Sequence, residues 1–183
     1  MPVNASPANP RRRTTEGTRP ARAETIAVRA PRRRQVFLFV VAAVAFLLDR
    51  ASKALVQHYL PLDAPQPLLG HLVYLTHTQN TGAAFSLGLS FGSFFLLLAA
   101  AVSLAIVVYN RRLPSDEVLL RVGLGMILGG ALGNALDRAV VGSVTDFIDL
   151  RWWPVFNVAD SCIVVGAVIS SARLSVRDRR RPA

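Results

Sequence analysis

Acidic and amide side chains are concentrated in one stretch of the chain, residues 129–160, with the sequence GGALGNALDRAVVGSVTDFIDLRWWPVFNVAD. Apolar segments flank it on both sides, at 118–128 and 162–169. Ionisable groups beside membrane-like segments are energetically costly and usually mark function. The stretch therefore predicts a pair of aspartates that activates water for peptide hydrolysis. The residues that could take part are Asn134, Asp137, Asp146, Asp149, Asn157 and Asp160.

Two carboxylates sharing one proton would provide both the base and the acid that peptide hydrolysis needs. Like charges about 3 Å apart cannot both ionise, so such a pair titrates as a unit. A metal site is less favoured because there is no HExxH motif and the histidines lack paired spacing. A Mg²⁺ site built from carboxylates alone stays open. Ser52 and Lys53 are adjacent, so on a helix they point in different directions and would not form a dyad.

Each candidate also has a purely structural explanation. Asp160 could be only a helix-start residue, and Asp146 only a turn residue. Asp137 with Arg138 could be an interface ion pair, and Asp49 with Lys53 an i,i+4 pair at a helix end. The spacing alone leaves these explanations open.

The composition points to a membrane protein with basic ends. Hydrophobic residues make up 52% of the 183 residues, the mean hydropathy is +0.39, and the net charge is +10. The first 34 residues hold nine arginines against Glu16 and Glu24, a net charge of +7. Beside membrane segments, such a tail indicates topology and anionic lipid rather than nucleic acid. We expect a disordered basic tail at 1–34, a membrane domain at 35–175 and a second basic tail at 176–183.

Four apolar segments are long enough to cross a membrane: 35–56, 91–109, 118–136 and 158–174. The first also resembles a secretory signal peptide, but no small-residue cleavage site follows it. Arginines precede the first segment, join the second to the third, and follow the fourth. The positive-inside rule then predicts that both termini are cytoplasmic. The polar residues that would lie near the outer face are Asp49, Asn80, Asp137, Asp146 and Asp160.

Local signals add detail to this topology. Residues 71–77 are rich in β-branched and aromatic types and predict a short strand. Gly125, Gly129 and Gly133 recur every four residues, on one helix face that would permit close packing in lipid. Asn157 is a candidate N-cap with Asp160 in the first turn of the last helix. The lone cysteine, Cys162, is expected to be a buried small hydrophobe.

These motifs resemble those of the lipoprotein signal peptidase (signal peptidase II) family of bacterial membrane aspartic proteases. The matching segments follow the family's order, between its four spans, over residues 36–174. They are DRASK at 49–53, NTGAAFS at 80–86, GGALGNALDR at 129–138, VTDF at 144–147 and FNVAD at 156–160. The Arg-rich start of the chain lies outside this pattern.

The resemblance implies an all-α membrane protein of four helices, with a small sheet and a mobile flap in the first outer loop. It implies an enzyme of the bacterial inner membrane, inhibited by globomycin and free of metal or other cofactor. We expect a monomer, although the sequence itself does not determine the oligomeric state. The substrate would be a prolipoprotein, cleaved just before its diacylglyceryl-modified cysteine. Asp146 and Asp160 would be catalytic. The residues that would support them or line the site are Asp49, Lys53, Asn80, Gly82, Asn134, Asp137, Arg138 and Asn157.

Two competing classes remain. A transporter or proton pathway would carry its carboxylates at mid-membrane, whereas these lie at span ends and in loops. A non-catalytic membrane assembly protein would tolerate conservative changes of the carboxylates.

Overall fold

The computed structural model describes residues 32–82 and 91–179. The expected disordered tail up to residue 31, the last residues from 180, and the segment 83–90 lie outside the described part. The rest of the NTGAAFS motif beyond Gly82, and the expected flap where it falls in 83–90, are therefore not described.

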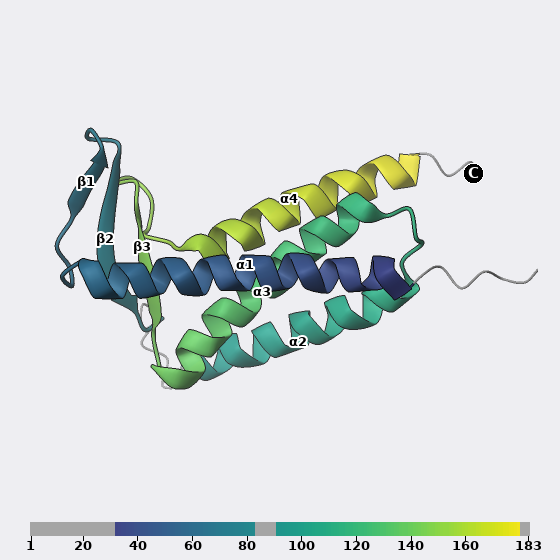
Figure 1. Ribbon diagram of the computed structural model, residues 1–183, viewed down its shortest axis with the longest axis horizontal. Helices are drawn as coiled ribbons and strands as arrows, with labels where there is room; N and C mark the ends of the chain where they lie inside the picture. The colour runs from purple at the N-terminus through teal and green to yellow at the C-terminus, as the bar shows by residue number, and fades with distance from the viewer. Residues whose placement is uncertain (1–31, 83–90, 180–183) are drawn as a thin grey trace, which may run out of the picture.

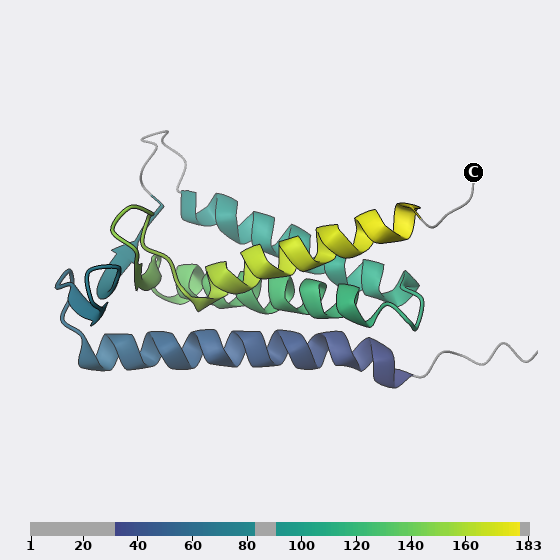
Figure 2. The ribbon, with the colours of Figure 1, turned by 90° about the horizontal axis from the view of Figure 1, so that it is seen from above.

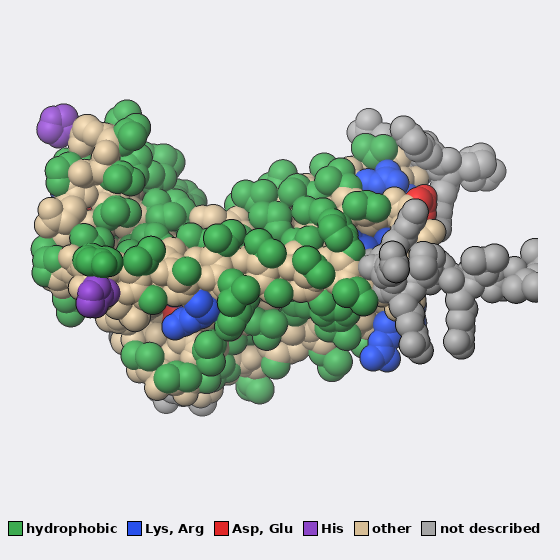
Figure 3. Space-filling view, viewed as in Figure 1, with side chains coloured by type: hydrophobic (Ala, Val, Ile, Leu, Met, Phe, Trp, Pro, Cys, Tyr) green, Lys and Arg blue, Asp and Glu red, His purple; other side chains and the backbone are tan. Residues whose placement is uncertain are grey.

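Four long helices lie side by side and make up the body of the molecule (Figure 1). Each is long and apolar enough to cross a membrane, which confirms the four predicted spans. Hydrophobic side chains cover the visible middle of the bundle, while Lys and Arg gather mostly at the end away from the sheet (Figure 3). The chain is a multi-pass membrane protein. The helices are α1 (Arg32–Tyr59), α2 (Phe91–Arg112), α3 (Val118–Val140) and α4 (Val158–Arg179).

Helix α3 packs against both α1 and α4 (Figure 2), and glycines on α3 allow these helices to approach closely. A Cβ added at Gly129 would overlap the backbone oxygen of Ala42 on α1, and one at Gly130 would overlap the backbone oxygen of Ala159 on α4. Small residues are used in this way where helices pack in lipid. Because the backbones are so close, short polar side chains near the ends of α1, α3 and α4 can reach one another.

A buried arginine closes the end of the bundle away from the sheet. Arg121 on α3 is 1% exposed and donates to the carbonyl oxygens of Leu113 (2.9 Å) and Ser115 (3.3 Å) in the turn after α2. Glu117 in the same turn pairs with Arg173 of α4 at 2.9 Å. The two hydrogen bonds from Arg121 satisfy carbonyl groups of the turn between α2 and α3, and the ion pair ties that turn to α4.

A three-stranded antiparallel sheet caps the other end of the bundle, in the order β1-β2-β3. The strand expected at 71–77 is present as β2 (Val73–Asn80), preceded by β1 (Gln66–Leu69). The third strand, β3 (Val144–Asp149), comes from the connection between α3 and α4, a contribution that the sequence analysis did not anticipate. The pairing places Gln79 opposite Thr145 and Thr78 opposite Asp146. The sheet thus joins the connection that holds Asn80 to the connection that holds Asp146.

Candidate active site

The first turn of α4 fixes the carboxylate of Asp160. The side-chain oxygen of Asn157 accepts the backbone N–H of Asp160 at 2.9 Å, and the Asp160 carboxylate accepts the backbone N–H of Asn157 at 3.2 Å. This reciprocal pair caps the helix, as the sequence predicted. The partial positive charge at the helix start also favours a carboxylate there. Asp160 is therefore both a capping residue and a fixed acidic group.

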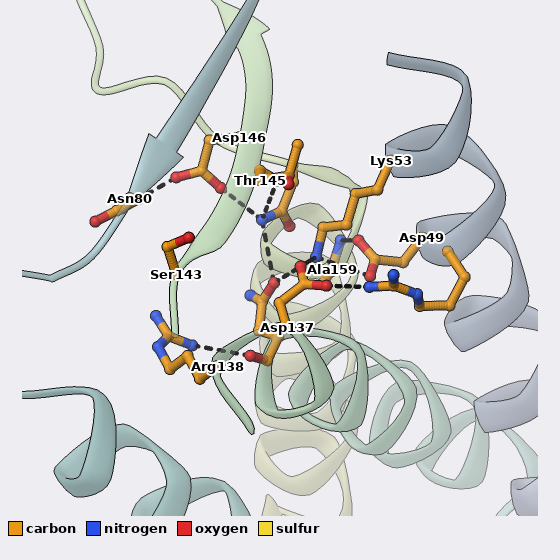
Figure 4. Close-up of polar contacts among 12 residues, drawn as sticks. Asp49, Lys53, Asn80, Asp137, Arg138, Ser143, Thr145, Asp146 and Ala159 are labelled. Carbon is orange, nitrogen blue, oxygen red and sulfur yellow. Dashed lines mark hydrogen bonds and ion pairs between the residues drawn. The ribbon is translucent and has the colours of Figure 1, made fainter. Parts of the chain in front are cut away.

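The carboxylate of Asp146 lies on β3 and is almost fully buried, with 2% exposed. It accepts hydrogen bonds from the side-chain amides of Asn80 (3.0 Å) and Asn157 (2.6 Å). Burial raises the pKa of Asp146 to about 6; the hydrogen bond from Asn80 opposes this shift, while the negative charge of Asp160 adds to it. Figure 4 shows Asn80 and Asp146 facing each other from neighbouring strands.

Asn157 brings the two acids together. Its side-chain amide donates to Asp146, and its backbone N–H donates to Asp160. The two acids that the sequence predicts to meet therefore share this one partner residue. The alternative in which Asp146 is only a turn residue does not fit, because Asp146 lies within a buried strand.

A lysine fixes the orientation of the neighbouring amide. The Nζ of Lys53 donates to Oδ1 of Asn134 at 2.8 Å, and Nδ2 of Asn134 donates to Asp160 at 2.8 Å. An ammonium group has only donors, so it can face only the oxygen of the amide. Lys53 on α1 thereby turns the Asn134 amide so that its N–H points to Asp160.

Lys53 also lies at the centre of a buried ionic cluster. It is fully buried and pairs with Asp49 at 2.9 Å and with Asp137 at 2.7 Å. Arg50 pairs with the other oxygen of Asp137, and the backbone N–H of Ala159 donates to Asp49 at 3.0 Å. The i,i+4 pair of Asp49 and Lys53 is present, but it faces the bundle interior. Asp137 forms its ion pairs with α1, rather than with its neighbour Arg138 as the structural alternative proposed.

Arg138 lies at the polar end of a cavity of about 280 Å³ between α2, α3 and α4. Its guanidinium donates to the backbone oxygen of Asn134 at 3.4 Å and lies over the ring of Phe95, 4.7 Å from the centroid. Asn134 and Asp160 lie with Arg138 in the lining and the other lining residues are apolar, so the cavity suits an aliphatic group beside Asp160. The lining residues are Phe95, Leu98, Ala99, Val102, Ile127, Ala131, Asn134, Arg138, Asp160 and Ile163.

Gly82 orients Asn80. The backbone N–H of Gly82 donates to the side-chain oxygen of Asn80 at 2.9 Å, and Gly82 has a φ of 70°. This left-handed conformation costs glycine little. The bond turns the NH₂ of Asn80 toward Asp146.

Some of the site's contacts come from residues that the sequence analysis did not single out. Arg50 pairs with Asp137, and Gln57 donates to the hydroxyl of Thr145 at 2.7 Å. The sequence did contain a signal that could have identified Arg50 and Gln57. Both lie one helical turn from Lys53, and therefore on or near the same face of α1. Thr145 directly precedes Asp146 in the VTDF motif.

Within the described residues, no group of three or more His, Cys, Asp or Glu side chains is arranged to hold a metal ion.

Comparison with known proteins decides the family. The model of the signal peptidase II (SPase II) family matches residues 41–175. The chain belongs to the signal peptidase II family. The matched range spans the candidate side chains from Asp49 to Asp160, and the family is one of peptidases.

Curated relatives agree with this assignment to signal peptidase II. The lipoprotein signal peptidase of Syntrophomonas wolfei is 47% identical over 134 residues, covering 73% of this chain and 85% of its own. The lipoprotein signal peptidase of Moorella thermoacetica is 40% identical over 130 residues, covering 71% of this chain and 87% of its own. The lipoprotein signal peptidase of Mycobacterium tuberculosis is 42% identical over 146 residues, covering 76% of this chain and 71% of its own.

Solved structures share the signal peptidase II fold seen here. Two are described as bacterial membrane enzymes, and each aligns with a TM-score of 0.69. The first is 24% identical and covers 80% of this chain and 92% of its own; the second is 25% identical and covers 75% and 91%. The fold of four helices with a small sheet is therefore that of known membrane enzymes.

Proposed function

We propose that the protein removes signal peptides from diacylglyceryl-modified prolipoproteins, cleaving just before the lipidated cysteine. We further propose an aspartic mechanism in which Asp146 and Asp160 form the catalytic pair. The observation that carries the proposal is the contact of Asn157 with both carboxylates. Family membership supports the substrate class, and the curated relatives are named lipoprotein signal peptidases.

The environments of the two acids support different roles. Burial raises the pKa of Asp146 to about 6, so this group retains a proton closer to neutral pH than an ordinary aspartate does. Asp160 accepts N–H bonds from Asn134 and Asn157 at the start of α4, where a negative charge is stabilised. In the proposed reaction, Asp160 takes the proton of the attacking water and Asp146 protonates the leaving amine. No covalent intermediate forms.

The surroundings of the pair fit an apolar substrate that arrives from the bilayer. The cavity ending at Asp160 and Arg138 is lined mainly by aliphatic and aromatic side chains. Such a lining suits the apolar part of a signal peptide or a lipid chain. We propose that the sheet lies at the outer face of the bacterial inner membrane and that both termini are cytoplasmic. One chain carries all the proposed site residues, so a monomer is sufficient.

Hydrolysis of a purified diacylglyceryl-modified prolipoprotein tests the proposal. We expect turnover by the wild type and a loss of about 10⁴-fold or more for Asp146→Asn and for Asp160→Asn, as is common when a catalytic group is removed. Asp63→Asn is the matched control, because Asp63 is an exposed aspartate outside the site, and it should retain wild-type activity. Each variant should keep the wild-type thermal unfolding profile to within a few degrees.

The outcomes separate the competing classes. Retained turnover in either Asp→Asn variant removes that residue from the pair. A wild type that cleaves no prolipoprotein but moves protons across vesicles would favour the transporter class. A chelator should leave the rate unchanged, and inactivation that added Mg²⁺ reverses would favour a metal mechanism.

A further inference from the structure

Strand β3 carries a second buried polar side chain next to Asp146. Thr145 is 2% exposed, and its hydroxyl oxygen accepts the side-chain amides of Gln57 (2.7 Å) and Gln79 (3.1 Å). Neighbouring residues of a strand point to opposite faces of the sheet. The Thr145 contacts therefore lie on the face away from the Asp146 carboxylate. The direct contacts described for the two acids do not include this hydroxyl.

The contacts of Thr145 extend into a short network. Gln79 lies directly opposite Thr145 in the sheet, and its side-chain oxygen accepts the hydroxyl of Ser143 at 2.8 Å. We call Gln57, Gln79, Ser143 and Thr145 the amide network. It connects the last turns of α1 with β2 and β3. A valine at 145 would match the shape of threonine but would remove the hydroxyl that both amides contact, leaving Gln79 with only its 3.4 Å contact to the ring nitrogen of His77.

The amide network shares its helix with the contact that orients the other acid. Gln57 follows Lys53 by one turn of α1, and Lys53 fixes the amide of Asn134 that donates to Asp160. One helix therefore holds the strand that carries Asp146 and, through Asn134, the partner of Asp160. The relative placement of the two carboxylates depends on both attachments.

We propose that Thr145 is a positioning residue, whose hydroxyl, held by Gln57 and Gln79, sets the placement of β3 so that Asp146 faces Asn157 beside Asp160. This inference rests on the proposed function. In this proposal Thr145 acts only through the placement of β3, and it has no role in substrate binding or proton transfer. Its effect is on geometry, and misplacement of a reacting group by about 1 Å can lower a rate by about 100-fold.

The test compares Thr145→Val, which removes the hydroxyl, with Thr145→Ser, which keeps it, in the prolipoprotein cleavage assay. We expect Thr145→Val to lower kcat by about tenfold or more with KM within about twofold, and to move the alkaline limb of the pH profile. Thr145→Ser should recover kcat to within about threefold. Thr76→Val is the matched control. Thr76 is a buried threonine of the same sheet that donates to Asp149 at 2.9 Å, and its replacement should leave kcat and the pH limb unchanged.

Gln57→Leu provides an independent test, because Gln57 is exposed and its replacement should not prevent folding. It should lower kcat in the same direction, and combining it with Thr145→Val should add little to the effect of Thr145→Val alone. Independent, multiplicative effects of the two changes would contradict the shared contact.

Other results would overturn the inference. Wild-type kcat in Thr145→Val would show that the hydroxyl contact positions nothing, and wild-type kcat in Gln57→Leu would show that β3 is not placed by its attachment to α1. If Thr145→Val accumulates to a lower level in cells but keeps the wild-type kcat and the wild-type alkaline limb of the pH profile, the amide network contributes only to the stability of the fold. A Thr145→Ser variant as slow as Thr145→Val would remove the role of the hydroxyl. If the wild type cleaves no prolipoprotein, the proposed function fails, and this inference fails with it.

Discussion

Asn157 needs both ends of its amide group. Its oxygen accepts the backbone N–H of Asp160, and its NH₂ donates to Asp146 and to the oxygen of Asn134. Among side chains of this size, only asparagine combines a separate acceptor oxygen with an NH₂ group that can donate two hydrogen bonds. An aspartate at this position would put a third carboxylate beside the pair, and the like charges would repel.

The pKa of Asp146 leads to a prediction about pH. If Asp146 must hold a proton to act as the acid, kcat/KM should fall as the pH rises through about 6, the pKa to which burial raises this group. The hydrogen bond from Asn80 lowers this pKa, so Asn80→Ala should raise it and move the alkaline limb to higher pH. The measurement is the pH dependence of prolipoprotein cleavage for both proteins.

Gln66→Ala is the control for this experiment, since Gln66 is exposed on β1 and should leave the limb in place. A limb that stays unchanged in Asn80→Ala, or that moves to lower pH, would show that the ionisation limiting the rate is not that of Asp146.

The sequence was enough to predict that Asn157 and Asp160 share a helix start, because capping depends on neighbours within one turn. It was also enough to place Asp49 and Lys53 on one helix face. It could not show that Lys53 reaches Asp137 and Asn134, because such contacts depend on how α1 and α3 are rotated about their axes. That rotation is set by the packing of whole helices.

At the level of elements, α3 is the most constrained helix, because glycines bring its backbone close to both α1 and α4. We expect Gly129→Ala to destabilise the protein by about 1–3 kcal/mol, since the added Cβ would overlap the backbone of Ala42 and force the helices apart. Thermal unfolding in detergent measures the effect as a lower Tm.

Gly92→Ala on α2 is the matched control, because a Cβ there meets nothing within 4 Å. It should be neutral or stabilising by about 0.5–1 kcal/mol, the usual advantage of alanine over glycine in a helix. Equal Tm values for the two variants would contradict the packing argument.

The helices were predictable and the sheet only partly so. Long apolar segments bounded by arginines such as Arg111 and Arg112 leave few alternatives to four spans. β2 was predicted from its β-branched and aromatic composition. β3 was not, because it is short and pairs with a strand that is distant in the chain, as Thr145 with Gln79. Pairing of this kind depends on tertiary contacts more than on local propensity.

At the level of the whole molecule, the charge distribution makes the proposed orientation testable. Arg111, at the end of α2, lies away from the sheet, whereas Gln66 lies in β1. In a Cys162→Ala background, a membrane-impermeant maleimide added to intact cells should label Gln66→Cys. It should label Arg111→Cys only after lysis.

Wild-type protein with Cys162 as its lone cysteine serves as the control, and half-buried Cys162 should label poorly in both conditions. Labelling of Arg111→Cys in intact cells, with Gln66→Cys protected, would reverse the proposed orientation and place the sheet in the cytoplasm.

The sheet order β1-β2-β3 has a consequence for biosynthesis. The strand that bears Asp146 pairs with a strand translated much earlier, and the hydrogen bonds to Asp146 also need Asn157, which directly precedes the last span. A nascent chain with only its first two spans in the bilayer has β2 but neither acid. The ribosome must therefore deliver the start of the final span to the translocon before the two acids can come together, so the proposed catalytic pair cannot assemble in a shorter nascent chain.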